Sequence, residues 1–351
     1  MIQRILIIKP SSLGDVVHAL PVLAGLRAAY PEAHIAWLVG SSFAPLLEGH
    51  PLLDEIIRFH RRHYGKMLRS PRSLVDFVRF VLALRRRRFD LVLDLQGLFR
   101  SGFLSLASGA RRRVGFADAR EMAGIFYNHR VRTSRRSCHA VEVNLCMARE
   151  LGLKVDPPSF PLGLRPEELL SARRLLSEVG GAGLERFTAV IPGTRWDTKR
   201  WRTDRLGELI DRMAAGGLPT CVLLGGPDDR SIAETVRAAA RVPVVDLVGR
   251  TSLRDLAAVL ALADLVVCQD SGPMHLAAAL GKPLVAIFGP TNPARTGPYY
   301  PSARIVSLPL ECVPCYRRHC PLRHHNCMEQ LDVNTVLDAV QHAWADICCS
   351  R

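Results

Sequence analysis

The sequence predicts an α/β protein made of two doubly wound domains with parallel sheets. The chain has 351 residues, which exceeds the length that one hydrophobic core normally serves. Apolar runs of strand length alternate with segments of helical period in both halves. A Pro-containing stretch at 155–165 separates the two halves and is typical of a connector between domains.

In the first half, each apolar run that precedes a helical segment is typical of a βα unit in a parallel sheet. We expect strands at 5–8, 34–40, 55–59 and 90–97, with helices at about 14–29 and from the third strand to Arg88.

After the connector, a helical segment at 167–178 leads into a second α/β series. We expect its strands at 187–193, 220–226, 244–249, 264–270 and 283–289. Doubly wound sheets bind ligands beyond the carboxyl ends of their strands, so two such domains predict a cleft between those ends.

Composition and charge limit where the protein works and what it binds. No apolar run is as long as a membrane span, and the apolar run near the start of the sequence is too short for a signal peptide, so we expect a cytoplasmic protein.

The net charge is +14, which favours nucleic acid, an anionic membrane surface or an acidic substrate as partner. Aromatic residues are 6% of the chain and do not interleave with the basic ones, which argues against single-stranded nucleic acid. Basic residues are concentrated in the first half, at Arg61, Arg62, Lys66, Arg69, Arg72, Arg79, Arg85 to Arg88 and Arg111 to Arg113. For any one of these arginines a solvated helix face is the simpler interpretation.

The segment KPSSLGDVVHALP at 9–21 places a single carboxylate, Asp15, in the turn between the first strand and the first helix. An aspartate there caps the helix in the simplest interpretation. A phosphate site is disfavoured, because the segment lacks the glycine patterns of phosphate loops and its carboxylate would repel the ligand.

In the second half, CQDSGPMHLAAALGKP at 268–283 has a strand that ends on Asp270, followed by Ser271, Gly272 and, one turn on, His275. Free N–H groups at the start of a helix, a hydroxyl and an imidazole suit a diphosphate. The alternative is a capped core helix with a hydrogen-bonded histidine.

Two further loops follow strands in the same domain. PGTRWDTKRW at 192–201 contains Thr194 and Lys199, and a lysine can neutralise a phosphate. LLGGPDD at 223–229 ends in Asp228 and Asp229, placed as the acidic residues that hold a ribose diol in Rossmann domains. Three such loops in one domain favour a nucleotide-sugar site.

These motifs, in this order and over nearly the whole chain, resemble the ADP-heptose:lipopolysaccharide heptosyltransferases of glycosyltransferase family 9. DLVLDLQGLFRS at 90–101, GFADAREMAGIFYN at 115–128 and HAVEVN at 139–144 are most similar to the heptosyltransferase I branch. The resemblance implies a GT-B fold of two facing Rossmann-like domains. Residues 1–165 would bind the acceptor and 166–331 the nucleotide-sugar, and a C-terminal helix at 332–351 could pack back on the first domain.

The resemblance also implies roles for the motif residues in a metal-independent, inverting transfer without a cofactor. Heptose would move from ADP-L-glycero-D-manno-heptose to Kdo or the first heptose of the lipopolysaccharide inner core. Asp15 would be the general base, which agrees with the need for a carboxylate to deprotonate the acceptor hydroxyl. The implied donor-binding residues are Thr194, Lys199, Asp229, Asp270, Ser271, Gly272 and His275.

The acceptor implied is Kdo2-lipid A or a heptosylated inner core at the inner face of the cytoplasmic membrane, and not nucleic acid. Candidate acceptor-binding residues are Ser12, Arg61, Arg62, Lys66 and Arg120. The helix at about 70–88, with an apolar stripe and a basic end, could lie on that membrane, although such a stripe is more often core.

Ten cysteines in a chain without an export signal indicate reduced thiols. Four of them, Cys312, Cys315, Cys320 and Cys327, fall within sixteen residues and allow a structural zinc site, an iron–sulfur cluster or unligated thiols. We assign them no catalytic role. Two other functions stay open: a GT-B enzyme with another donor or an epimerase activity, and a non-enzymatic binder of anionic glycolipid.

Overall fold

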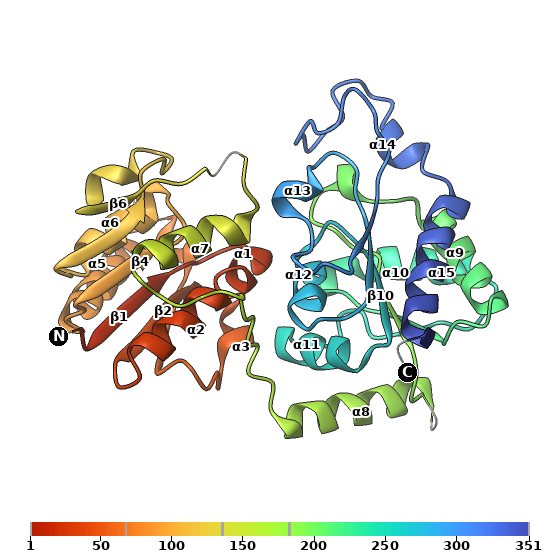
Figure 1. Ribbon diagram of the computed structural model, residues 1–351, viewed down its shortest axis with the longest axis horizontal. Coiled ribbons are helices and arrows are strands. Elements are labelled where there is room, and N and C mark those ends of the chain that lie inside the picture. Colours follow the sequence, from red (N-terminus) through yellow and green to blue (C-terminus); the bar gives the residue numbers. More distant parts are fainter. Residues whose placement is uncertain (1, 67–68, 135–136, 182–183, 350–351) are drawn as a thin grey trace. The chain divides into compact units, whose positions relative to one another are not determined.

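The computed structural model describes residues 2–66, 69–134, 137–181 and 184–349 (Figure 1). The chain divides into two compact units, Met1–Gly163 and Leu164–Arg351, two residues before the boundary expected from the sequence. Each unit has a six-stranded sheet in which all pairings are parallel. The α/β class with two Rossmann-like domains is thus confirmed.

The sheet of the first unit has the strand order β3-β2-β1-β4-β5-β6. Its strands are β1 (Arg4–Ile8), β2 (His34–Gly40), β3 (Glu55–Phe59), β4 (Leu91–Asp94), β5 (Arg112–Phe116) and β6 (His129–Val131). The central strand β1 is apolar on both faces and buried from Ile5 to Ile8, as expected for a parallel sheet with helices on both sides. The order of strands reverses between β1 and β4, and such a switch point is where doubly wound sheets bind ligands.

The helices of the first unit are α1 (Leu13–Val17), α2 (Leu20–Ala29), α3 (Ala44–Leu47), α4 (Arg61–Tyr64), α5 (Pro71–Arg86), α6 (Phe99–Ala107), the 3-10 turn η1 (Ala123–Phe126) and α7 (Ala140–Glu150). The single helix expected at 14–29 is therefore two helices. Proline favours the first turn of a helix because its missing N–H is not needed there, and Pro21 stands at the start of α2. The helix expected to end at Arg88 starts at Pro71, where Ser70 caps it.

The second unit repeats this topology, with the order β12-β11-β10-β7-β8-β9 and a switch point between β7 and β10. Its strands are β7 (Thr188–Ile191), β8 (Cys221–Leu223), β9 (Val245–Asp246), β10 (Leu265–Gln269), β11 (Leu284–Ile287) and β12 (Arg304–Val306). Its helices are α8 (Pro166–Gly180), α9 (Thr203–Ala215), α10 (Arg230–Ala239), α11 (Leu253–Leu262), α12 (Gly272–Ala279), α13 (Pro293–Thr296), α14 (Asn326–Glu329) and α15 (Val333–Cys349), with 3-10 turns η2 (Asp197–Lys199) and η3 (Pro227–Asp229).

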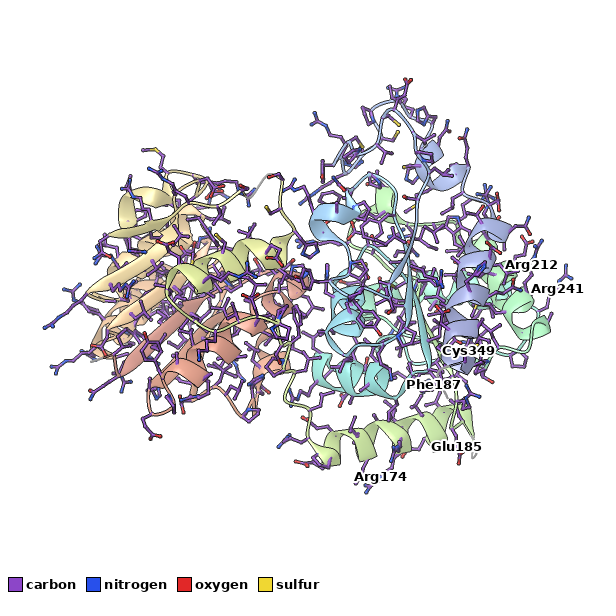
Figure 2. The ribbon with its side chains drawn as sticks, viewed as in Figure 1. Arg174, Glu185, Phe187, Arg212, Arg241 and Cys349 are labelled. Carbon is purple, nitrogen blue, oxygen red and sulfur yellow. The ribbon has the colours of Figure 1, made fainter. Side chains whose placement is uncertain are left out.

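The C-terminal helix α15 is part of the core of the second unit. Helix α15 contacts α9, β11 and β12 (Figure 1), and Val336 and Val340 are fully buried in the core of the second unit. Arg212 on α9, labelled in Figure 2, donates to Asn334 on α15 at 2.5 Å. Valines three or four residues apart share one face of the helix, and that face is used by the sheet of its own unit.

Among the described residues, none of the helices has both the length and the apolar character needed to span a bilayer.

Candidate functional site

Asp15 lies in the first turn of α1, the helix that follows β1, beside the switch point of the first unit. Its Oδ2 accepts hydrogen bonds from the backbone N–H and the hydroxyl of Ser12, both at 2.8 Å. Its Oδ1 is 3.4 Å from the ammonium of Lys9, the residue directly after β1. The Asp15 side chain is 40% exposed, whereas that of Lys9 is only 6% exposed. The carboxylate therefore supports the start of α1, as a capping residue would, and also keeps access to solvent.

Lys9 fixes the charge state of this carboxylate. Burial would raise the pKa of Asp15, but the Lys9 ammonium, the hydrogen bonds from Ser12 and the nearby His18 together hold that pKa well below its ordinary value. Asp15 is thus ionised at neutral pH. Lys9 also donates to the carbonyl of Leu95 at 2.8 Å, just beyond β4, so the Lys9–Asp15 pair joins the two strands of the switch point.

The other candidate acceptor residues lie in loops that follow strands of the first sheet. Arg61 and Arg62 begin α4, directly after β3, and Lys66 stands in the turn after that helix. The backbone N–H of Arg120 donates to the carbonyl of Gly97 in the loop after β4. All four side chains are exposed, whereas Ser12 contacts Asp15 directly.

In the second unit, the structure brings together Lys199 and Asp270 from different loops. Lys199 ends η2 after β7, Asp270 follows β10, and the two form an ion pair of 2.6 Å across the switch point. Both side chains are largely buried, 16% and 5% exposed, and Thr291 donates its hydroxyl hydrogen to the same Asp270 carboxylate. The Lys199 ammonium also lies 4.6 Å from the centre of the Trp196 ring. The Lys199 ammonium is thus held by the Asp270 carboxylate and the face of the Trp196 ring, at the end of the sheet where a ligand is expected.

Asp229, at the end of η3, lies against the loop that follows β7. Its carboxylate accepts from the backbone N–H of Gly226 at 2.9 Å. A Cβ atom at Gly193 would stand 2.1 Å from Asp229 Oδ1, so only glycine allows this close approach. Burial raises the pKa of Asp229, although the hydrogen bond from Gly226 and the charge of Arg200 oppose that shift.

Thr194 has a structural role in the same loop. Its hydroxyl donates to the carbonyl of Trp196 and accepts from the backbone N–H of Trp196. Thr194 thereby shapes the segment that carries Lys199.

Ser271, Gly272 and His275 form the start of α12, next to the Lys199–Asp270 pair. Ser271 occupies the N-cap position, yet its hydroxyl makes no hydrogen bond within the described chain although its oxygen is buried. His275 lies in the first turn and is 8% exposed. A buried hydroxyl without a partner is costly, and at a helix start it is available to an anionic ligand.

Sequence reasoning missed three residues that hold these loops together. They are Lys9, Thr291 and Gln269, whose side chain accepts from the Trp201 backbone N–H at 2.8 Å and donates to the Pro192 carbonyl at 2.7 Å. Each is a polar residue at or just beyond the end of a buried strand, and that position was the available signal.

None of the four clustered cysteines forms a disulfide bond. Within the part of the chain that the structure describes, no group of three Cys, His, Asp or Glu side chains is placed to hold a metal ion. Burial and the neighbouring Cys315, Cys312 and Cys320 raise the pKa of Cys327 to about 11. The segment also supports the Lys199 loop, because the hydroxyl of Thr198 donates to the carbonyl of Arg317 at 2.8 Å.

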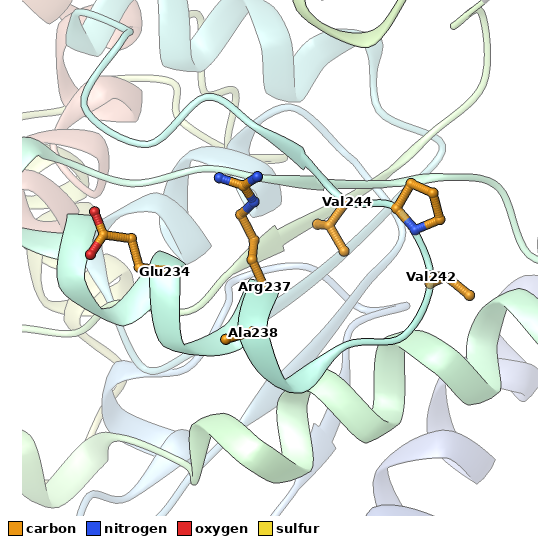
Figure 3. A pocket seen from close by; sticks show the side chains of 6 residues that line it. Glu234, Arg237, Ala238, Val242 and Val244 are labelled. Atoms are coloured by element: carbon orange, nitrogen blue, oxygen red, sulfur yellow. The ribbon is translucent and has the colours of Figure 1, made fainter.

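A surface depression of about 470 Å³ lies elsewhere in the second unit (Figure 3). It is lined by Glu234, Arg237, Ala238, Val242, Pro243 and Val244. These residues lie on α10 and on the segment that joins it to β9, at the amino end of that strand. The depression is therefore at the opposite edge of the sheet from the candidate donor residues.

Two Rossmann-like units in tandem, each with polar loops at its switch point, are typical of the GT-B fold. Residues 77–326 match the family model described as glycosyltransferase family 9 (heptosyltransferase), and the chain belongs to that family. It is 32% identical to lipopolysaccharide heptosyltransferase 1 of Pseudomonas aeruginosa over 321 residues, which cover 91% of this chain and 87% of that protein. It is also 32% identical to lipopolysaccharide heptosyltransferase 1 of Escherichia coli K12 over 312 residues, 88% of this chain and 95% of that one.

Among solved structures, Escherichia coli heptosyltransferase WaaC with ADP is similar, with a TM-score of 0.76 and 27% identity over 97% of this chain and all of that one. The similarity to the heptosyltransferase I branch that the sequence motifs indicated is confirmed.

Proposed function

We propose that this protein transfers heptose from ADP-L-glycero-D-manno-heptose to the Kdo or first heptose of the lipopolysaccharide inner core, with inversion and without a metal ion. The observation that carries the proposal is the largely buried Lys199–Asp270 ion pair beside the hydroxyl of Ser271, which has no hydrogen-bond partner among the described residues. This arrangement suits a diphosphate. The named relatives are lipopolysaccharide heptosyltransferases, and one similar solved structure holds ADP-2-deoxy-2-fluoro heptose.

On the donor side, the charge that develops on the leaving ADP must be stabilised. Lys199 offers an ammonium, and Ser271, His275 and the N–H groups at the start of α12 offer hydrogen-bond donors and a positive dipole end. Asp270 orients the lysine before the donor arrives. Asp229 is the proposed partner of the ribose diol.

On the acceptor side, Asp15 is the proposed general base. The acceptor oxygen bonds to the anomeric carbon of heptose, its proton passes to Asp15, and the bond to ADP breaks with its electron pair on the diphosphate. Since Lys9 lowers the pKa of Asp15, the carboxylate is deprotonated at neutral pH but is a weak base. Proton transfer is then favourable once the new bond has made the hydroxyl acidic.

Arg61, Arg62, Lys66 and Arg120 are the proposed partners of Kdo carboxylates and lipid A phosphates, because guanidinium groups pair well with both. Such an acceptor is anchored in a lipid bilayer, so the proposal includes peripheral contact with the inner face of the cytoplasmic membrane.

The test is an ADP-release assay with ADP-L-glycero-β-D-manno-heptose, run with Kdo2-lipid A and, separately, with its heptosylated product. We expect ADP release with Kdo2-lipid A that is unchanged by EDTA. Release only with the heptosylated product would move the enzyme to another branch. No release with either acceptor would contradict the proposal and favour another donor, an epimerase or a non-enzymatic binder.

A further inference from the structure

The outward side of helix α5 carries apolar side chains that the fold does not use. Within this helix only Ser73 and Leu84 are buried. Four large apolar side chains are each between 46% and 48% exposed: Leu74, Val75, Val78 and Leu82. They follow one another at intervals of one, three and four residues, so they form a single stripe along the helix. Phe77 and Phe80 supply the contacts with the core instead.

The elements next to α5 continue this apolar surface. Of the twelve large apolar side chains exposed among the described residues, eight lie on α5, α6 and the turn at η1. The rings of Phe77 on α5 and Phe103 on α6 stack at 6.2 Å, and Phe103 also contacts Phe126 of η1, so the three elements pack side by side (Figure 1). Monomeric proteins rarely expose so much apolar surface in one place, and such a patch indicates a partner. Besides the four residues of α5, the exposed apolar side chains of this surface are Phe99, Leu106, Met122 and Ile125.

Arginines run beside the stripe. Arg72, Arg79 and Arg86 are exposed and seven residues apart, which places them in one line along α5. The acidic groups here are already engaged: Asp76 contacts His63 and Arg79, and Glu121 accepts from the Phe99 backbone N–H. A partner for this surface must therefore be both apolar and anionic. A bilayer that contains anionic lipids has these two properties.

We propose that α5, α6 and η1 form a docking face for an anionic lipid bilayer. Leu74, Val78 and Leu82 enter the boundary between headgroups and acyl chains, while the arginines meet lipid phosphates. Helix α4 adjoins this face, since His63 of α4 lies 3.0 Å from Asp76 of α5. The inference rests on the proposed function in one respect, that Arg61 and Arg62 at the start of α4 bind an acceptor held in the same bilayer.

The experiment is flotation of the full-length protein with vesicles of phosphatidylcholine, with and without phosphatidylglycerol, in the absence of donor and acceptor. We expect binding only to the anionic vesicles. The triple variant Leu74→Ser/Val78→Ser/Leu82→Ser should bind at least about tenfold more weakly through lost apolar burial. The variant Arg72→Ser/Arg79→Ser/Arg86→Ser should lose on the order of a hundredfold, about fivefold for each arginine.

The matched control is Leu170→Ser/Ile305→Ser/Leu322→Ser, which removes three exposed apolar side chains of the second unit. It should float as the wild type does. Thermal midpoints and ADP affinity should stay at wild-type values in all three variants, because the substituted side chains lie outside the core and the donor loops.

Three results would overturn the inference: equal binding to neutral and anionic vesicles, equal loss in the control variant, or self-association that the Leu74 triple variant abolishes. The last result would mean that a second copy of the chain covers the face. None of these measurements depends on the transfer reaction, so failure of the docking face and failure of the proposed function are distinguishable.

Discussion

The two units share one topology but use a lysine–aspartate pair differently at their switch points. In the first unit Lys9 is buried and Asp15 is 40% exposed, so the carboxylate is the member of the pair that faces solvent. In the second unit Asp270 is buried and Lys199 is largely buried, and Asp270 is also bound by Thr291. The same two residue types thus present a carboxylate in one unit and a held ammonium in the other.

The difference teaches that the surroundings, and not the residue types, assign the chemistry. A solvent-accessible carboxylate whose partner is a buried cation can accept a proton from a substrate. A carboxylate enclosed by a lysine and a threonine can orient the lysine but has no open side for a substrate hydroxyl. Substitutions at each pair therefore test separate steps of the proposed reaction: the proposed proton transfer to Asp15 and the proposed donor binding by Lys199.

The largest effect is expected for Asp15→Asn. Asparagine keeps the shape and can still accept from Ser12, so folding should survive, while turnover should fall by about two to four orders of magnitude through loss of the base. The measurement is kcat together with the thermal midpoint. Asp255→Asn is the matched control, because Asp255 accepts from the Ser252 backbone N–H at the start of α11 as Asp15 does from Ser12. If the turnover of the Asp15 variant stays within a few-fold of wild type, Asp15 is not the general base and only caps α1.

The next effect is expected for Lys199→Ala. Loss of a charge-assisted contact with the diphosphate costs about 1.5–3 kcal/mol, which is roughly tenfold to a hundredfold or slightly more in affinity. Calorimetry with ADP measures it. The control is Lys282→Ala, which removes a lysine of the same unit that donates to the carbonyl of Ala261. If both variants bind ADP as the wild type does, Lys199 does not face the phosphates.

The strands that sequence predicted best are β2, which is almost wholly apolar, and β3, in which three apolar residues outnumber Glu55 and Arg58. The expected ranges 34–40 and 55–59 agree with β2 and β3 at both ends. Strands β5, β6 and β12 were missed, and each contains arginine: Arg112 and Arg113, Arg130, and Arg304. Strands β6 and β12 are edge strands and β5 is next to one, where charged side chains reach water, so hydrophobic pattern alone does not reveal such strands.

For the candidate site, the sequence predicted residues within single loops but not the contacts between loops. Asp270 stands directly after β10, and Lys199 and Asp229 lie in the loops that follow β7 and β8. That position is the local signal on which their predicted roles rest, and those roles stay predictions. The ion pair between Lys199 and Asp270 could not be predicted, because it depends on which strands are neighbours in the sheet. Lys9 was missed for the same reason: its second partner, the Leu95 carbonyl, is 86 residues away in sequence.

A smaller effect, seen mainly in the pH profile, is expected for Lys9→Met. An opposite charge this close lowers an aspartate pKa by about 1–3 units, so its removal should raise the pKa of Asp15. A carboxyl with a depressed folded pKa stabilises the fold above its unfolded pKa, and this contribution disappears as pH falls through the folded value. In the wild type that loss is therefore complete only well below about pH 4.

In the Lys9 variant the acid limb of kcat/KM should move upward by about one pH unit or more, into a range where the wild type is flat. The matched control is Lys154→Met, an exposed lysine of the same unit. Coincident acid limbs for the wild type and the Lys9 variant would mean that Lys9 does not set the charge of Asp15.

The smallest effect is expected for Ser271→Ala, and it separates a ligand-binding hydroxyl from a capping one. Since the Ser271 hydroxyl makes no hydrogen bond within the described residues, its removal should leave the thermal midpoint unchanged. ADP affinity should fall about threefold to tenfold, the value of one ordinary hydrogen bond of about 0.5–1.5 kcal/mol. Ser252→Ala should do the reverse, because the Ser252 hydroxyl accepts from the Asp255 backbone N–H. Losing that cap costs about 1 kcal/mol, or roughly 2–4 °C in thermal midpoint, with ADP affinity unchanged. If the Ser271 variant has a lower thermal midpoint and unchanged ADP affinity, Ser271 caps α12 and does not bind the ligand.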